Sequence, residues 1–444
     1  MAEEMEAKIK SGDGRKRIGY ANESFYYAFS GEQSTMIRAE LTLTEAVEPE
    51  ALRTALSQAL LRYPNFRQTL AIGEDNTLYY VPKEGAPRLD LEDGRQLYLA
   101  TAETNGYLFR VVYEGKRLVV CLHHGLTDGK GALEFTKTLL YDYLRALGRL
   151  VRTGGLVLTN GEAADPTEQE DSFATYGDPA AKPLGLYQNQ GAFRIPEPLF
   201  DERQPYCRRL RLRCSMQALL QLAKRYGSTP VPILSILIAR VLRRLYDVGE
   251  QPVTGYIPVN LRPYYHSKAL NNFSLAVTLP YKARTEAFDW DVQATIQRGI
   301  LDLQAQKENF AYKMAQLCAA GEQTARLPLP APQKQALLAA KLREKSREQY
   351  SYLLSYLGAL ELPPDLRAVV QDMEIYIPSY LIPFTICALA LDDQLTLTCT
   401  QGFEADKLVS GLYEMLQELG IAAEYEDLGI VRTDKLLLYK IAKC

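Results

Sequence analysis

Two of the chain's three histidines stand side by side, and a carboxylate follows four residues after the second. The segment, residues 123–129, reads HHGLTDG. Imidazole is the side chain whose ordinary pKa best suits proton transfer near neutral pH. The pattern therefore indicates a general base held in this segment.

The segment joins an expected strand to an expected helix. Residues 118–122 form an apolar run before it, and apolar residues recur at helical spacing over 132–147 after it. A loop held between two buried elements can fix an imidazole in place. Gly129 and Gly131 can adopt backbone conformations closed to other residues, so we expect a sharp turn there.

Spacing alone leaves two functions open for Asp128. Its carboxylate could orient the imidazole, as in a hydrolytic triad, or it could pair with a distant arginine and hold the loop. A single histidine near an aspartate is more often structural than catalytic. We favour a functional site because both histidines, the carboxylate and Gly129 occur together at a strand-to-helix turn.

This segment resembles the His-His-x-x-x-Asp-Gly motif of the CoA-dependent acyltransferases with the chloramphenicol acetyltransferase fold, in their condensation-domain and alcohol acyltransferase branch. Residues 50–56 and 61–67 are similar to the first helix and following strand of that family. Residues 258–263 and 271–273 are similar to the segment that supplies an arginine and to a strand lining the site. The resemblance implies an α/β (α+β) fold of two such subdomains, each a mixed sheet flanked by helices, with an active-site channel between them.

The resemblance also implies a role for each residue of the motif. His124 would deprotonate an acceptor hydroxyl or amine, which then attacks a thioester carbonyl directly. Asp128 would pair with Arg262 and have a structural role, with Gly129 completing the motif. We expect His123 to hydrogen-bond to the backbone and hold the loop.

The tetrahedral oxygen formed in such an attack needs a hydrogen-bond donor, worth on the order of 3 kcal/mol. The candidates for this role, or for lining the channel, are Ser355, Asn271 and Asn272, which lie at the ends of expected strands. Each of them could equally be a packing or capping residue. The third histidine, His266, is expected in an exposed loop.

The chain departs from some of these relatives. It lacks the Asp-Phe-Gly-Trp-Gly signature of the plant branch, and its only tryptophan, Trp290, lies in an acidic context. The histidine motif lies in the first third of the chain, as in the two-domain, single-chain members. These residues include no carrier or adenylation domain. We therefore favour a freestanding enzyme.

A chain of 444 residues exceeds the usual single core, so we expect two domains. We predict a disordered tail at 1–17, an N-terminal subdomain with the motif at 18–150, a crossover linker at 151–205 and a C-terminal subdomain at 206–444. Regular patterning fails in the linker. Elsewhere strands and helices alternate, which favours mixed sheets.

The residue pattern predicts the limits of two helices and the surroundings of one arginine-rich strand. A helix is expected to begin at Pro49 and to stop at Pro64, which cannot continue it. One long helix is expected at 292–320. The arginines at 208, 209, 211 and 213 could meet the phosphates of CoA or a carrier protein, but we favour a solvated strand face.

Composition narrows the class of protein. The net charge of -3 and the lack of a basic arm argue against nucleic acid. The most apolar segment, 231–246, contains three arginines and falls short of the ~20 apolar residues that span a bilayer. Seven cysteines without a Cys-x-x-Cys pair indicate reduced thiols in a cytoplasmic protein. We expect a monomer with no metal site and no tightly bound cofactor.

The favoured function is an acyl-CoA-dependent O-acyltransferase, with acyl-CoA as substrate and a small alcohol or amine as acceptor. The first alternative is an enzyme of the condensation type that forms an amide or ester from an acyl group on a carrier protein. A binding module that has lost turnover is a second alternative, although the intact motif counts against it. A hydrolase is a weaker option because no Gly-x-Ser-x-Gly segment occurs.

Overall fold

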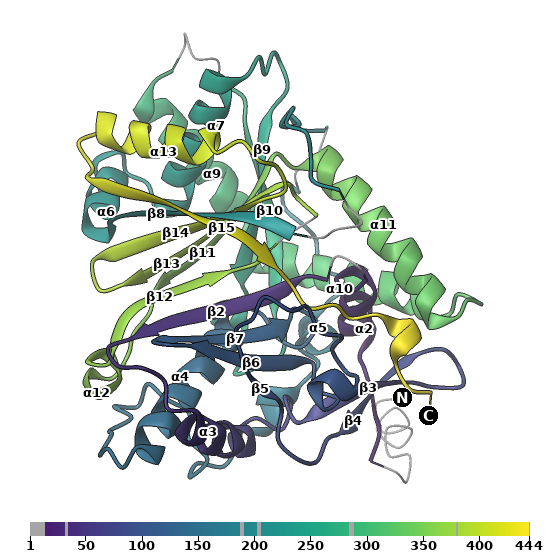
Figure 1. Cartoon of the computed structure of the whole chain (residues 1–444). Helices are drawn as coiled ribbons and strands as arrows, with labels where there is room; N and C mark the ends of the chain where they lie inside the picture. The colour runs from purple at the N-terminus through teal and green to yellow at the C-terminus, as the bar shows by residue number, and fades with distance from the viewer. Residues whose placement is uncertain are drawn as a thin grey trace.

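Two mixed β-sheets stand at the centre of the molecule, and helices cover their outer faces (Figure 1). This arrangement confirms the predicted fold class. The computed structural model describes residues 14–31, 34–186, 191–201, 206–283, 288–378 and 381–443.

The five-stranded sheet has the order β12-β2-β7-β6-β5 and carries the histidine motif at the end of β7. Its strands are β2 (Met36–Leu43), β5 (Leu89–Leu91), β6 (Phe109–Glu114), β7 (Arg117–His123) and β12 (Val370–Tyr376). Only β5 and β6 pair in parallel. Helices α3 (Pro49–Arg62) and α4 (Gly129–Ala146) lie beneath this sheet in Figure 1.

The seven-stranded sheet has the order β10-β9-β11-β13-β14-β8-β15. Its strands are β8 (Tyr206–Ser215), β9 (Val253–Asn260), β10 (Ser274–Tyr281), β11 (Tyr352–Ala359), β13 (Phe384–Leu391), β14 (Gln394–Gln401) and β15 (Ala423–Arg432). Strand β11 pairs in parallel with β9 and β13. Figure 1 shows the outer face covered by α6 (Met216–Arg225), α7 (Pro230–Leu245), α9 (Trp290–Gln304) and α13 (Lys407–Glu418).

One strand from late in the chain belongs to the first sheet. After β11 and the short helix α12 (Pro364–Arg367), β12 pairs antiparallel with β2, and the chain then returns to the second sheet as β13. Each sheet thus receives strands from beyond residue 350. The predicted domain limits divide the chain into consecutive segments. No local sequence pattern indicates that β12, from the C-terminal segment, joins the sheet of the N-terminal segment.

A group of helices lies at one end of both sheets, on the right of Figure 1. It contains α2 (Tyr20–Ala28), α5 (Ser172–Tyr176), α10 (Lys307–Ala325) and α11 (Ala331–Gln349). Next to it, β1 (Lys16–Arg17), β4 (Leu78–Pro82) and β3 (Gln68–Ile72) form a third, small sheet. Of the predicted tail at 1–17, residues 1–13 lie outside the described residues. The last two residues of the predicted tail, Lys16 and Arg17, form strand β1 and pair with β4. The predicted boundary at residue 17 therefore lies too far along the chain.

The helix predicted at 292–320 is two helices, so that prediction was wrong. The first, α9, ends at Gln304, and α10 begins at Lys307. Asn309 explains the break, because its side-chain amide donates to the carbonyl oxygens of Leu303 at 2.9 Å and Gln304 at 3.3 Å. These carbonyls at the end of α9 are therefore satisfied without a further helical turn.

The arginines of β8 do not form the solvated face that the sequence favoured. Arg209 is buried and donates to Glu40 of β2 at 3.0 Å and to Glu374 of β12. Arg211 donates to the same Glu374 at 3.1 Å. Burial acts to raise the pKa of Glu40. Arg209 has the largest opposing effect, and together with Arg117 it lowers this pKa to about 2. Ion pairs therefore join the two sheets.

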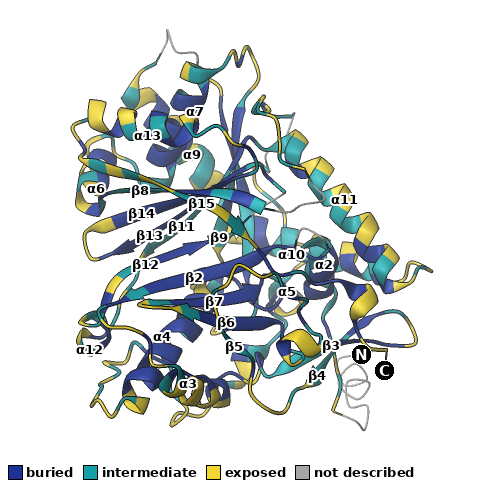
Figure 2. Ribbon diagram, in the orientation of Figure 1, coloured by how far each residue is buried: buried dark blue, intermediate teal, exposed yellow. Residues whose placement is uncertain are grey.

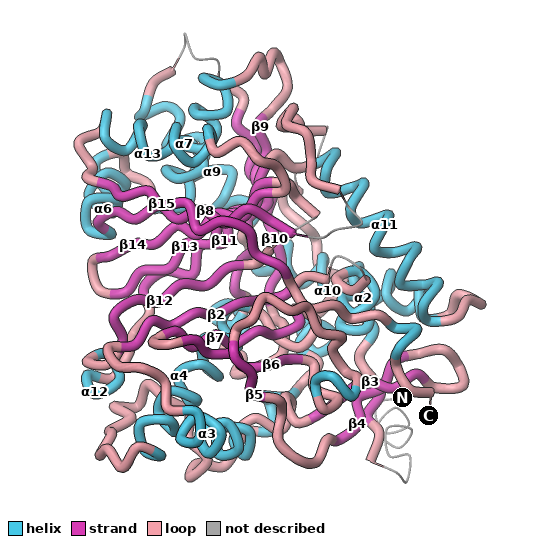
Figure 3. Tube along the Cα trace, in the orientation of Figure 1, coloured by secondary structure: helices cyan, strands magenta, loops and turns pink. Residues whose placement is uncertain are grey.

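Figure 2 shows that the buried residues follow the strands and the inner faces of the helices, while exposed residues mark the outer helix faces and the loops. Figure 3 shows the same layering by secondary structure, with strands inside and helices outside. Within the part of the chain that the structure describes, no helix is long and apolar enough to cross a membrane.

Candidate active site

The turn from β7 into α4 positions the histidine pair. His123 is the last residue of β7 and pairs with Met36 of β2, so the strand fixes its backbone. Asp128 caps the helix, since its Oδ1 accepts a hydrogen bond from the backbone N–H of Gly131 at 3.1 Å. His124 is thus held between a buried strand and a capped helix, as the sequence indicated.

The His123 ring is a fixed part of the loop. Its Nδ1 accepts a hydrogen bond from the backbone N–H of Gly125 at 3.0 Å. Its Nε2 therefore carries the proton and donates to the carbonyl of Phe29 at 3.2 Å, with the hydroxyl of Ser30 at 3.0 Å. Burial first, and the neighbouring His124 second, lower the pKa of His123 to about 3. This neutral ring holds the loop and has no free nitrogen for catalysis.

Close packing requires glycine at position 131, and Gly129 lies against a leucine side chain. Neither Gly129 nor Gly131 has a positive φ, so the expectation that they supply unusual backbone conformations was wrong. A Cβ on Gly131 would lie 2.6 Å from the carbonyl oxygen of Leu270, and one on Gly129 would lie 2.9 Å from the side chain of Leu357. The first contact is with rigid backbone, so a larger residue there would displace the loop.

Asp128 and Arg262 form the ion pair that the resemblance implies. The Nη1 of Arg262 lies 2.8 Å from Oδ2 of Asp128, and the backbone N–H of Phe273 donates to the same oxygen at 2.8 Å. Arg262 also donates to the carbonyls of Ala269 and Asn271. Burial opposes ionisation, but Arg262 and the backbone N–H groups of Phe273 and Gly131 together lower the pKa of Asp128. Both oxygens of this carboxylate are bonded to groups other than His124, so Asp128 holds the loop.

The ring of His124 is neutral near pH 7. Its backbone N–H donates to the carbonyl of Thr35 at 3.0 Å, while its Nδ1 is buried and has no hydrogen-bond partner among the described residues. Burial lowers the pKa of His124; the backbone carbonyls of His124 itself and Thr127, and the charge of Asp128, act in the opposite direction. A neutral imidazole can accept a proton.

Two cavities meet at His124. Cavity A has a volume of about 500 Å³ and cavity B a volume of about 420 Å³. Four residues line both of them, namely His124, Pro258, Ser274 and Ile377. A reactant in either cavity therefore reaches the same imidazole.

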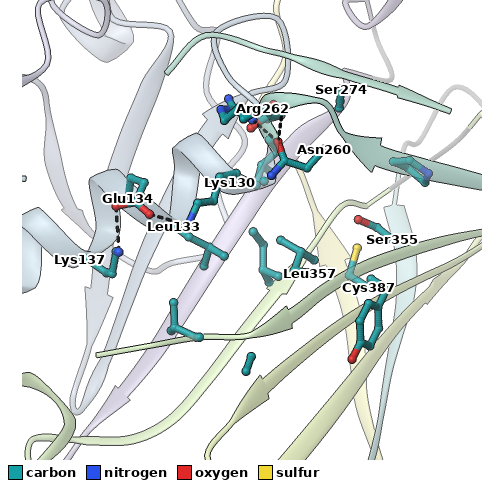
Figure 4. Close-up of a pocket in the computed structure, with 18 of the residues that line it drawn as sticks. Lys130, Leu133, Glu134, Lys137, Asn260, Arg262, Ser274, Ser355, Leu357 and Cys387 are labelled. Atoms are coloured by element: carbon teal, nitrogen blue, oxygen red, sulfur yellow. Dashed lines mark hydrogen bonds and ion pairs between the residues drawn. The ribbon is translucent and has the colours of Figure 1, made fainter. Parts of the chain in front are cut away.

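Cavity A has a mixed polar and apolar lining drawn from both sheets and from α4 (Figure 4). Its polar residues include Lys130, Glu134, Lys137, Asn260, Arg262 and Ser355. Glu134 pairs with Lys130 at 2.7 Å and with Lys137 at 2.8 Å. Cavity B has a mainly apolar lining from α2, α10, α11 and β10.

The three candidates for the oxyanion or channel role have separate positions. Ser355 lines cavity A, and its hydroxyl makes no hydrogen bond with the described residues. Asn272 lines cavity B and donates to the carbonyl of His124 at 3.4 Å. Asn271 lines neither cavity, and its side-chain oxygen accepts a hydrogen bond from Asn65 at 3.2 Å. The structure brings two of the three to the cavities.

Sequence reasoning missed two residues of the site. Ser274 lines both cavities and donates to the side-chain oxygen of Asn272 at 3.1 Å. Cys387 lines cavity A beside Ser355, to which it is paired across neighbouring strands (Figure 4). Burial raises the pKa of this thiol to about 12, so it stays protonated. The even spacing of Ser274 from Asn272 could have indicated a shared strand face.

Among the residues that the structure describes, the remaining histidine and the acidic and cysteine side chains do not add a metal site. His266 lies in an exposed loop, as expected. The described residues contain no group of three or more histidine, cysteine, aspartate or glutamate side chains that could hold a metal ion.

No family model and no curated protein matches the sequence, but solved structures are similar to it. Polyketide synthase associated protein 5 from Mycobacterium tuberculosis is 15% identical, with a TM-score of 0.60 over 92% of this chain and 98% of that one. TRI101 of F. sporotrichioides, complexed with coenzyme A and T-2, is 13% identical, with a TM-score of 0.56 over 93% and 99%.

A third similar structure is a variant of the starter condensation domain of rhizomide synthetase RzmA in complex with C8-CoA and Leu-SNAC. It is 12% identical, with a TM-score of 0.56 over 94% of this chain and 95% of that one. The chain therefore has the fold of these proteins, two of which were solved with coenzyme A or an acyl-CoA.

Proposed function

We propose that the protein is an acyl-CoA-dependent O-acyltransferase in which His124 is the general base. The observation that supports this most directly is the position of a neutral imidazole where two cavities of different polarity meet. A reaction between two bound substrates needs such an arrangement, because orienting both reactants can remove roughly 7–11 kcal/mol of the barrier. The shared fold with proteins that bind CoA supports the same proposal.

The proposed reaction is a direct transfer. The imidazole of His124 takes the proton of the acceptor hydroxyl. At the same time the oxygen of that hydroxyl bonds to the thioester carbon. The tetrahedral intermediate then collapses, the carbon–sulfur bond breaks, and His124 returns the proton to the leaving thiolate. The ester and free CoA are the products. His123 and the pair of Asp128 with Arg262 position the base and do not contact the reacting atoms.

We place the thioester in cavity A. The pantetheine arm of CoA carries amides and hydroxyls, which the polar side chains of this cavity can meet, and Lys130 is exposed where a phosphate could approach. Ser355 is the proposed donor to the tetrahedral oxygen, because its hydroxyl lines the cavity and is not bonded elsewhere. Such a donor contributes about 3 kcal/mol when it is well placed.

His124→Ala should lower kcat by about 10²–10⁴-fold, since a placed base contributes that much. The assay measures release of free CoA from acetyl-CoA with a thiol reagent across a panel of alcohols and amines. His266→Ala is the matched control, because that histidine is exposed in a loop outside both cavities and its loss should leave kcat unchanged. An alanine at 124 with undiminished turnover would disprove the role of the base.

The similarity to a condensation domain favours a second candidate, in which the donor acyl group is carried by a protein. Both candidates use the same base and differ in the donor. The same assay separates them when an acyl group loaded on a carrier protein is offered beside free acyl-CoA. Turnover with the carrier-loaded donor alone would select the second candidate.

A further inference from the structure

We infer that cavity B binds an unbranched hydrocarbon chain attached to one of the two reactants. This inference rests on the proposed acyl transfer and names the substrate class of the same site. The chain would extend from the reacting centre at His124 toward the helices α2, α10 and α11.

The lining of cavity B is the first argument. Its walls are mainly aliphatic and aromatic side chains, including Phe25, Phe29, Leu317, Leu338, Leu342 and Ile382. Burial of such surface against a ligand is favourable in proportion to the apolar area removed from water. The lining of cavity A is divided between polar and apolar side chains and includes two ion pairs, so its apolar wall is smaller.

The polar groups of cavity B supply the second argument, because several of them are already hydrogen-bonded within the protein. The hydroxyl of Ser24 donates to the carbonyl of Tyr20 at 3.0 Å, and that of Thr324 donates to the carbonyl of Ala320 at 3.0 Å. The hydroxyl of Ser274 donates to the side chain of Asn272. A sugar or other polyol would leave some of its own hydroxyls without partners against this mainly apolar wall, which is costly for groups removed from water.

The charged residues are confined to one helix. Lys341 and Lys345 are one turn apart on α11, and both are exposed, so they mark the side of cavity B that is open to solvent. Among the described residues, no carboxylate lines this cavity. An acceptor with a cationic body would therefore meet no countercharge, whereas an uncharged chain needs none.

The volume sets the length of the chain. At ~30 Å³ for a water-sized group, a cavity of about 420 Å³ has room for about 14 such groups. A methylene group is of similar size. A chain of up to about 14 carbons would therefore fit in the cavity with its reacting group at His124.

The test compares two chain-length series in the wild-type enzyme and in two filling variants. One series runs from 1-butanol to 1-octanol with acetyl-CoA, and the other from butanoyl-CoA to octanoyl-CoA with ethanol. Ala276→Phe adds a ring to cavity B, and Ala359→Phe adds the same ring to cavity A. Neither alanine is part of the proposed catalytic machinery.

We expect kcat/KM to rise about fourfold per methylene in one of the two series, which identifies the reactant that carries the chain. Ala276→Phe should abolish this rise and Ala359→Phe should preserve it. Ala320→Trp, on an exposed turn of α10 that lines cavity B, repeats the test if Ala276→Phe does not fold. A rate independent of chain length in both series, or a rise that survives filling of cavity B, overturns the inference.

A binding measurement separates this inference from the proposed function. Isothermal titration of 1-octanol into His124→Ala requires no turnover. Binding that is retained in His124→Ala and lost on addition of Ala276→Phe supports the hydrocarbon site even if the enzyme proves to have another activity. Absence of octanol binding, or binding unaffected by Ala276→Phe, overturns the inference whatever the activity.

Discussion

Arg209, which is buried, and Arg262, which is partly buried, both pair with carboxylates from distant parts of the chain, yet their surroundings differ. Arg262 contacts one carboxylate, Asp128, beside the loop that carries His124, and it also lines cavity A. Arg209 contacts two carboxylates, Glu40 and Glu374, on strands of the other sheet, and it lines neither of the cavities that meet at His124.

The difference separates two functions of the same chemical group. Arg209 joins the sheets, so its contribution belongs to the folding of the whole molecule. Arg262 anchors the end of a loop, so its contribution belongs to the position of one imidazole. Removing one partner of either pair weakens the compensation of the charge that remains. The consequences should therefore appear in stability at the first site and in catalysis at the second.

The largest effect is expected for Arg209→Ala. It removes the cation that the buried Glu40 and Glu374 share and leaves each with one other arginine. The loss should therefore lie at the lower end of about 3–5 kcal/mol of unfolding free energy. Urea unfolding measures this loss, and kcat per folded molecule should stay near that of the wild type. Arg208→Ala is the matched control on the same strand, because its partner Asp427 is 40% exposed and such pairs are worth about 0–1 kcal/mol. Equal losses in the two variants would contradict the distinction between the sites.

Asp128→Asn should have a smaller effect on stability and a larger one on catalysis. The amide oxygen can still cap α4 at Gly131, but Arg262 loses its countercharge, at a cost of about 1–3 kcal/mol. A displacement of His124 by about 1 Å can lower kcat about 10²-fold. Steady-state kinetics beside urea unfolding measures both. If kcat were unchanged while stability fell, the pair would hold the fold and not the base.

The family resemblance implied the pair of Asp128 with Arg262, whereas the pair between the sheets was missed for a physical reason. The contacts of His124 and Asp128 are set by a short strand, turn and helix, which have local signatures. The exposure of Arg209 depends on β12, a strand that returns to the other sheet more than 150 residues later. Alternation along a strand shows that two faces differ, but not what covers each face.

The dependence on distant elements also explains why the sequence could not decide between the two asparagine candidates. Asn271 and Asn272 are adjacent, and a sequence pattern does not separate them. In the structure Asn272 lies at cavity B, and Asn271 bonds to Asn65 in the other half of the molecule. Which of two neighbours faces a cavity depends on the packing of distant elements. Local reasoning therefore identified the segment and left the residue open.

The smallest expected effect is a dependence of activity and stability on pH. It distinguishes the histidine pair from the carboxylates between the sheets. A base is active when it is neutral, and burial lowers the pKa of His124, so the acid limb of kcat/KM should have its midpoint below the ordinary value of 6.5. His123 binds its proton more weakly when folded, so stability falls as pH drops from 6.5 toward 3. Glu40 contributes stability that is complete above its ordinary pKa of 4.5 and is lost only as pH falls toward 2.

Between pH 5 and 7 the changes should therefore originate at the histidine pair and not at the carboxylates between the sheets. A pH profile of kcat/KM, with unfolding followed at each pH, measures the limb in the wild type and in Arg209→Ala. Both should give the same midpoint, since Arg209 lies outside the two cavities at His124. A midpoint at or above 6.5 would mean that the imidazole is solvated in the working enzyme. A midpoint that shifts with Arg209→Ala would instead mean that the sheet contacts also set the environment of the base.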